Sequence, residues 1–217
     1  MEKTKDKSIK EKILSDIYFI AIIVAILIIV SFFIQINFGT GMSMYPTCTN
    51  RSLSVAKTVH KNTELKRYDV INTKRLPNNN NEKIRKRIVG LPGETITIKG
   101  SKVYIDGDEF NDPAAFVNSR ASGTVTEGKN VYLDDVKLNI GEKFYYKDIA
   151  SIQEDENNVY LISEKTWTLG DDEYFVMGDN RCMSNDSREF GPIKRNEITS
   201  INLVYVNIFY NHGGFDL

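Results

Sequence analysis

The sequence has little of what builds metal centres, disulfide frameworks or nucleic-acid interfaces. Its 217 residues include two cysteines, Cys48 and Cys182, and neither belongs to a closely spaced pair of the kind that binds zinc, so no metal site is expected. The two thiols could equally form one disulfide or stay reduced. The formal net charge is −1, which gives no basic field to attract nucleic acid. The length suits one anchor and one compact domain.

Histidine is also scarce, and this limits the types of active site. The two histidines are His60 and His212, and a Ser-His-Asp triad would have to use one of them. His60 lies between Val59 and Lys61, and His212 lies in the C-terminal NHGGF segment, so neither neighbourhood indicates a catalytic base. A reactive serine in this chain would therefore need another kind of base.

Charged residues are absent between Asp16 and Arg51, and the first part of this interval is almost wholly apolar. As a helix, the eighteen residues 17–34 would span about 27 Å, close to the roughly 30 Å hydrocarbon core of a bilayer. We expect a transmembrane anchor over 17–38 after a tail over 1–16. A cleaved secretory signal would have a shorter apolar run followed by an A-x-A-like site, and no such site follows here. A buried core helix would have a polar face, and this segment has none.

The N-terminal tail indicates how this anchor is oriented. Lysines are concentrated there, at positions 3, 5, 7, 10 and 12. Under the positive-inside rule the tail lies in the cytoplasm, residues 39–217 lie across the cell membrane, and the chain passes through once. No other stretch of the sequence is long and apolar enough to span a bilayer.

Beyond residue 40 the sequence lacks a helical period of useful length, and its short apolar runs are typical of strands. Strands are expected at 67–73, 83–89, 95–99, 102–105, 173–177 and 198–210. Residues 107–150 are polar and rich in Gly, Asp and Asn, so we expect an insertion or small subdomain there. The predicted class is mainly β with one N-terminal helix, and 39–217 forms the extracytoplasmic domain.

A serine on a glycine-containing loop follows the anchor closely. Ser43 lies in GTGMSMYPT, residues 39–47, after two glycines and before Pro46. Glycines let a backbone approach a substrate, and proline stiffens the chain that leaves the loop. The pattern makes Ser43 a candidate nucleophile, although an ordinary turn after an anchor has the same composition.

A lysine in a strand pattern is the candidate base. Lys86 lies in IRKRIVGLPG, residues 84–93. Alternate residues of an extended chain share a face, so Lys86 would lie between Ile84 and Ile88 on an apolar face. Burial disfavours the ammonium and lowers the lysine pKa, which can make a lysine a base near neutral pH. The alternative is a solvated basic strand at a sheet edge.

A third segment, GDNRCMSNDSREFG at residues 178–191, is dense in small, turn-forming and charged residues. Four of its charged residues can form mutual ion pairs that fix a loop: Asp179, Arg181, Asp186 and Arg188. Hydrogen bonds to a neighbouring site can come from Asn180, Ser184 and Ser187. A calcium loop or a solvated turn are the alternatives, but the acidic spacing of an EF-hand is absent.

Together these segments resemble the ordered motifs of the type I signal peptidase family. GMSMYPT resembles the Ser-Met-x-Pro-Thr nucleophile motif, RYDVI the short strand motif after it, and IRKRIVGLPGE the lysine motif. GDNRCMSNDSREFG resembles the Gly-Asp-Asn-Arg motif. The similarity covers about residues 39–110 and 174–192, and the order of the motifs behind a single anchor agrees with the family.

The resemblance implies a β-rich serine endopeptidase with a Ser/Lys dyad that works without cofactor or metal. Ser43 would attack the scissile carbonyl, Lys86 would be the general base, and the Ser43 backbone N–H would stabilise the oxyanion. The resemblance also gives supporting roles to five residues: Ser184 orients the lysine, and Asp186, Arg188, Asp179 and Arg181 hold the site.

The implied substrates are secretory preproteins with small residues at positions −3 and −1 of the cleavage site. Membrane lipid and the secretion machinery are the other partners to expect, and nucleic acid is not one. The sequence departs from the family pattern at Gly41, where some members carry a second oxyanion donor. It also departs at Cys48 and Cys182, and our hypothesis is that these form a disulfide or tune the pocket.

Three other functions fit parts of the pattern. An anchored assembly factor with a signal-peptidase fold needs no proteolysis, but the presence of both Ser43 and Lys86 argues against it. A self-cleaving Ser/Lys regulator needs a helix-turn-helix where the anchor lies. An anchored β-domain that only binds a partner predicts that Ser43 and Lys86 can be replaced without loss of function.

Overall fold

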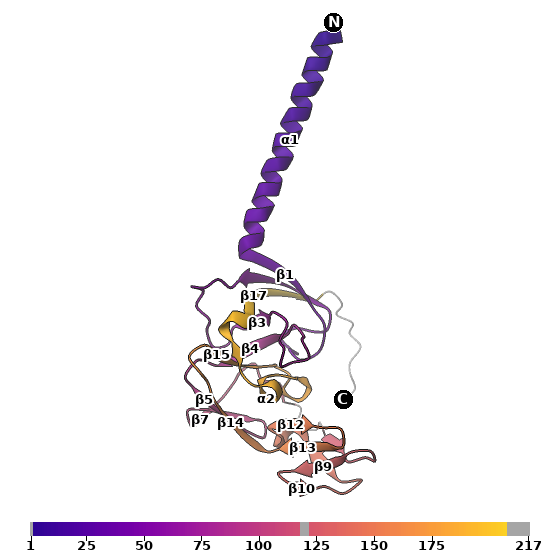
Figure 1. Ribbon diagram of the computed structural model, residues 1–217, viewed down its shortest axis with the longest axis vertical. Coiled ribbons are helices and arrows are strands. Elements are labelled where there is room, and N and C mark those ends of the chain that lie inside the picture. The colour runs from indigo at the N-terminus through magenta and orange to yellow at the C-terminus, as the bar shows by residue number, and fades with distance from the viewer. Residues whose placement is uncertain (1, 118–121, 208–217) are drawn as a thin grey trace.

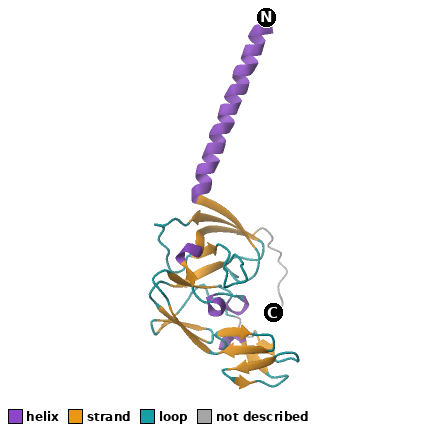
Figure 2. Cartoon of the chain, viewed as in Figure 1, coloured by secondary structure: helices purple, strands orange, loops and turns teal. Residues whose placement is uncertain are grey.

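The computed structural model describes residues 2–117 and 122–207. It is mainly β with one long N-terminal helix, which confirms the predicted class (Figure 2). The other helical segments are single turns: η1 (Tyr146–Asp148), η2 (Arg181–Met183), α2 (Ser187–Phe190) and η3 (Arg195–Glu197). The predicted last strand reaches only Asn207 in the structure, and residues 208–210 lie outside the described part of the chain, as does His212.

The N-terminal helix α1 (Glu2–Phe33) stands away from the rest of the molecule (Figure 1). Its stretch Lys12–Phe33 is long and apolar enough to cross a membrane, and none of it is buried in protein. The prediction that the anchor continues to Phe38 is wrong, because Ile34–Gly39 forms strand β1. Here apolar residues alternate with polar ones, and the segment pairs antiparallel with strand β2 (Ser52–Thr58).

The sheet nearest to α1 has seven strands, and it carries both Lys86 and the strands on either side of the Ser43 turn. Its strands pair antiparallel throughout. In spatial order they are β1, β2, β17 (Ile198–Asn207), β3 (Val70–Thr73), β4 (Arg85–Gly90), β15 (Glu173–Met177) and β16 (Ile193–Lys194).

A second sheet of four strands packs beside the first. In spatial order these are β14 (Glu164–Thr168), β5 (Thr95–Lys99), β6 (Lys102–Ile105) and β7 (Asp108–Phe110). The expected β5–β6 hairpin is present. Strands β4 and β15 belong to two hydrophobic clusters: Ile88 and Val176 join one, and Val89 and Phe175 join the other. The adjacent buried residues of each strand point to opposite faces, so β4 and β15 lie between the two clusters.

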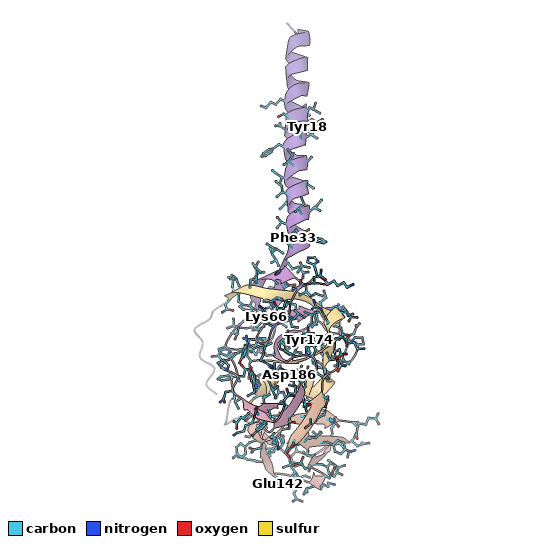
Figure 3. All side chains as sticks on the ribbon, turned by 90° about the vertical axis from the view of Figure 1, so that its left-hand side faces the viewer. Tyr18, Phe33, Lys66, Glu142, Tyr174 and Asp186 are labelled. Carbon is cyan, nitrogen blue, oxygen red and sulfur yellow. The ribbon has the colours of Figure 1, made fainter. Side chains whose placement is uncertain are left out.

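A small subdomain lies at the end of the molecule opposite α1, where Figure 3 labels Glu142. Its strands are β8 (Ser122–Thr124), β9 (Asn130–Leu133), β10 (Val136–Lys137), β11 (Lys143–Tyr145), β12 (Ser151–Glu154) and β13 (Asn158–Ile162). The predicted bounds 107–150 are therefore wrong at both ends. Residues 108–110 pair with β6, and the subdomain extends to residue 162 because β13 pairs in parallel with β9.

Candidate active site

Ser43 lies on the turn between β1 and β2, the first two strands after the helix. The turn is closed by backbone hydrogen bonds from Tyr45 N to Met42 O (3.1 Å) and from Cys48 N to Met44 O (3.0 Å). The Met44 side chain is buried and packs with Cys48 and Val70. This apolar contact fixes the turn, so Ser43 is half-buried on a constrained loop, as its sequence neighbourhood indicated.

Lys86 is the second residue of β4 and pairs with Ile71 of β3. Its side chain is only 4% exposed, so the predicted burial is confirmed. The Lys86 Nζ donates a hydrogen bond to the Ser43 Oγ at 2.8 Å. Two residues 43 positions apart in the sequence thus meet as a hydroxyl and an amine in direct contact.

Burial in the domain lowers the pKa of Lys86 from 10.5 to about 8. The negative charge of Asp186 opposes this shift, and the positive charge of Arg188 reinforces it. At pH 7, about one molecule in ten then holds an uncharged amine beside the hydroxyl, compared with about one in three thousand for an ordinary lysine. The arrangement can therefore remove a proton from Ser43 near neutral pH.

The ion pair of Asp186 and Arg188 is present as expected. Asp186 is fully buried and accepts from Arg188 Nε at 2.8 Å and from Arg188 Nη2 at 3.0 Å. It also caps α2 and accepts from Gly178 N at 2.9 Å. Burial alone would raise the pKa of Asp186, but the charge and hydrogen bonds of Arg188 lower it below its usual value. In Figure 3 Asp186 lies inside the β-rich body, remote from Tyr18 of the helix.

Asp179 and Arg181 form ion pairs with residues outside the 178–191 segment. This corrects the prediction that all four charged residues pair with one another. Asp179 accepts from Arg87 Nε at 2.8 Å and from Arg87 Nη2 at 2.7 Å, and Thr47 Oγ1 donates to it at 2.5 Å. Arg181 pairs instead with the buried carboxylate of Asp112. Sequence reasoning missed Arg87 and Asp112, since ion pairs across long sequence separations leave no local pattern.

Asn180 holds the backbone around the serine. Its N–H donates to the carbonyl of Ser43 at 3.0 Å, and its Nδ2 donates to the carbonyl of Met42 at 3.2 Å. The segment containing Phe116 in turn bridges Asn180 in parallel. Ser187, by contrast, does not reach the site, because its Oγ accepts from Val176 N at 2.9 Å.

Ser184 lies beside the serine but makes no hydrogen bond to Lys86. Its Oγ is buried and has no hydrogen-bond partner within residues 2–117 and 122–207. A Cβ at Gly178 would lie 2.1 Å from this Oγ and 2.4 Å from the Ser43 carbonyl oxygen. Glycine is therefore required at 178 for the loop to approach the nucleophile this closely.

The two cysteines form no disulfide, and His60 lies away from the Ser43–Lys86 pair. No disulfide joins Cys48 and Cys182, so that version of the hypothesis is wrong. Cys48 packs in the Met44 cluster, whereas Cys182 lies on the η2 turn. His60 stacks on Phe32 at the end of α1, with ring centroids 4.6 Å apart, and takes no part in the site.

A cavity of about 220 Å³ opens beside the Ser43–Lys86 pair. Both residues line it, together with residues of the β1–β2 turn and of the segment leading into β4. Within the described part of the chain, the Ser43 N–H makes no hydrogen bond, and the N–H of Gly41 donates to Asn50 Oδ1 at 2.9 Å. The site thus offers a hydroxyl, an amine and an open backbone donor to a bound group.

Comparison with known proteins gives a consistent result. The family described as "Signal peptidase, peptidase S26" matches residues 11–206. Signal peptidase I V of Bacillus subtilis (strain 168) is 32% identical over 162 residues, which is 74% of this chain and 79% of that protein. Signal peptidase I of Bacillus amyloliquefaciens is 30% identical over 205 residues, which is 90% of this chain and 87% of that protein. The crystal structure of a signal peptidase I from Enterococcus faecalis V583 aligns with a TM-score of 0.38 and 23% identity, over 64% of this chain and 97% of that chain.

Proposed function

Because the chain belongs to the signal peptidase family, peptidase S26, and is a serine endopeptidase anchored to a membrane, we propose that it removes signal peptides with Ser43 as nucleophile and Lys86 as general base. The observation that carries this proposal is the 2.8 Å hydrogen bond between Lys86 Nζ and Ser43 Oγ, with the lysine 4% exposed. An amine that touches a serine hydroxyl and is kept largely from water has the position and the basicity that proton transfer requires.

The reaction proceeds through an acyl-enzyme. The uncharged Lys86 takes the proton of Ser43 Oγ while that oxygen attacks the carbonyl carbon of residue −1 of the substrate. The lysine then gives this proton to the departing amine, and the amide bond breaks. In the second half, Lys86 takes a proton from water while the water oxygen attacks the ester carbonyl. Lys86 then returns this proton to Ser43 Oγ as the bond between that oxygen and the acyl carbon breaks.

The oxyanion of each tetrahedral intermediate is stabilised by the backbone N–H of Ser43, which has no other partner in the described structure. Gly41 has no hydroxyl to serve as a second donor. Ser184 is the positioning residue that we assign to Lys86, because its buried hydroxyl lies beside the Ser43 carbonyl and is not committed elsewhere.

The remaining supporting residues act through the loops that they hold. The Asp186–Arg188 pair fixes the loop that carries Ser184. The Asp179–Arg87 pair ties the turn after β15 to β4 and, through Thr47, to the nucleophile turn. The buried pair of Arg181 with Asp112 ties the loop after β15 to the segment before Phe116.

Substrates are secretory preproteins with small residues at −3 and −1, as the resemblance implies. The lysine-rich tail lies in the cytoplasm, and the β-rich domain lies across the cell membrane. The helix α1 keeps the active site at the lipid surface where signal segments emerge, close to the secretion machinery, and this raises the effective concentration of substrate.

Cleavage of a preprotein in detergent by single-residue variants tests this function. Ser43→Ala and Lys86→Ala should abolish turnover with the fold retained. Lys86→Arg should also fail, because a guanidinium does not lose its proton near neutral pH. Matched controls are Ser101→Ala, on a turn of the second sheet, and Lys102→Arg at an exposed position of β6, both of which should cleave normally.

Full activity of Lys86→Arg would refute the assignment of the base. Full cleavage by both Ser43→Ala and Lys86→Ala would refute the Ser/Lys dyad. Absence of cleavage by the wild type would instead indicate an anchored domain that only binds its partner.

A further inference from the structure

Arg85, the residue before Lys86, is held in an unusual way. Its Nε donates to Asn72 Oδ1 at 3.1 Å, its Nη1 to Ser52 Oγ at 3.0 Å, and its Nη2 to Ser54 Oγ at 2.8 Å. All three acceptors are buried and uncharged, and both serines are 1% exposed. The carbonyl of Asn37 (3.4 Å from Nη2) and the ring of Tyr205 (5.9 Å from Cζ) also lie near it, so the guanidinium is held by neutral groups of the first sheet.

The charge of Arg85 lacks a carboxylate partner in the described part of the chain. Within residues 2–117 and 122–207, Arg85 forms no ion pair, whereas three other arginines near the site each have one. A guanidinium that is partly removed from water without a counter-ion is costly unless a group of opposite polarity reaches it. The position therefore favours a ligand with an oxygen acceptor.

The cavity beside the active site reaches this guanidinium. Arg85, Ser52 and Cys48 line the cavity that Ser43 and Lys86 also line. Ser52 and Cys48 are the two partners of Arg85 Nη1, so this nitrogen faces the cavity wall. Its contact with Cys48 Sγ is long, at 3.9 Å, and sulfur is a weak acceptor, so a ligand oxygen can replace it.

Gly39 makes room for the Arg85 guanidinium. A Cβ at position 39 would lie 2.6 Å from Arg85 Nη1, and the guanidinium occupies the space that a side chain there would need. The absence of a side chain at residue 39 therefore makes room for the guanidinium beside the end of β1. Gly39 and Arg85 both line the cavity.

We propose that Arg85 determines substrate specificity at position −3 of the preprotein. Its guanidinium donates hydrogen bonds to a small side chain with an oxygen acceptor, namely Asp, Asn or Ser, with Asp preferred. This rests on the proposed function. In an extended substrate the side chains of −1 and −3 point the same way, about 7 Å apart. Residue −1 lies at the Ser43–Lys86 pair, because Ser43 attacks its carbonyl, and the cavity leads from this pair to Arg85.

The other charged groups around the cavity agree with this preference. Lys86 is uncharged in the reactive state. Glu82 and Lys83 both line the cavity at exposed positions, where their opposite charges offset each other and are screened by water and salt, so the fixed charge of Arg85 dominates. A lysine or arginine at −3 would meet Arg85 at close range and be rejected.

The test uses the full-length protein in detergent and one preprotein with Asp, Asn, Ala or Lys at position −3. Asp and Asn have the same shape and differ in charge, so their ratio reports the field of Arg85 without altering the enzyme. We expect kcat/KM for Asp to exceed that for Asn about tenfold and that for Lys by much more. In Arg85→Met the Asp-to-Asn ratio should fall to about one.

Equal rates for Asp and Asn in the wild-type enzyme would overturn the proposal, and so would an Asp preference that persists in Arg85→Met. Should Arg85→Met fail to fold, Arg85→Lys gives a second measurement, in which the preference should shrink because lysine lacks the planar fork. A failure of the proposed function would look different, since none of the four preproteins would then be cleaved.

Discussion

Raising the pH from 6 to 9 should increase kcat/KM of the wild-type enzyme about ninety-fold, because only the uncharged form of Lys86 can take the serine proton. With the pKa of Lys86 lowered to about 8, the uncharged fraction is about 1% at pH 6 and about 90% at pH 9. The rate should therefore rise about tenfold between pH 6 and 7, bend near pH 8 and level off above it.

The assay is the initial rate of preprotein cleavage at substrate concentrations well below KM, at constant ionic strength, since kcat/KM reports the free enzyme. The substrate should carry no group near the cleavage site that titrates between pH 6 and 10. Preincubation at each pH followed by a measurement at pH 8 separates protonation from loss of the fold.

Two results would refute the reasoning, and they refute different parts of it. A rate that is independent of pH from 6 to 9 would mean that no such amine acts as the base. A rate that still rises tenfold per unit up to pH 10 would mean that the base is a lysine with an ordinary pKa, and that burial of Lys86 does not set the reactivity.

Lys86→Met should abolish turnover yet stabilise the fold at pH 7 by about 3 kcal/mol, because a shift of the pKa from 10.5 to about 8 penalises the buried ammonium by that amount. In thermal unfolding this gain should shrink as the pH rises from 8 to 10.5, where the folded wild type sheds the proton before the unfolded chain does. Gly178→Ala should lower kcat/KM about a hundredfold, because the new Cβ would lie 2.1 Å from Ser184 Oγ. The control Gly170→Ala should not lower kcat/KM, because the nearest atom to its Cβ is 3.5 Å away. Equal rates for the two variants would contradict the close approach at Gly178. Asp112→Ala leaves Arg181 buried without its counter-ion and should cost about 3 to 5 kcal/mol in chemical denaturation, whereas a loss below about 1 kcal/mol would show that the pair does not fasten the loop.

The parts of the site that local patterns encode could be predicted from the sequence. The turn with Ser43 follows from its glycines and proline, and the burial of Lys86 follows from the strand alternation that puts it on one face with Ile88. The ion pair of Asp186 with Arg188 is two residues apart and is therefore a local feature as well.

The parts that depend on distant pairing could not be predicted. The pair of Arg87 with Asp179 joins residues 92 positions apart, and the pair of Arg181 with Asp112 joins residues 69 positions apart. Both alternatives, pairing inside the loop and pairing outside it, satisfy the same charge pattern. The subdomain bounds failed for the same reason, because a parallel pairing between two strands is not visible in the composition of either one.

Three consecutive basic residues of β4 show why position in the fold, and not charge, assigns their roles. Arg85 is surrounded by neutral oxygens, Lys86 is buried against a hydroxyl, and Arg87 forms a bidentate pair with Asp179. A guanidinium stays charged in all of these environments, so burial can tune the protonation of the lysine alone. The middle residue can therefore become a base, while its neighbours keep fixed charges, one compensated by the protein and one left for a substrate.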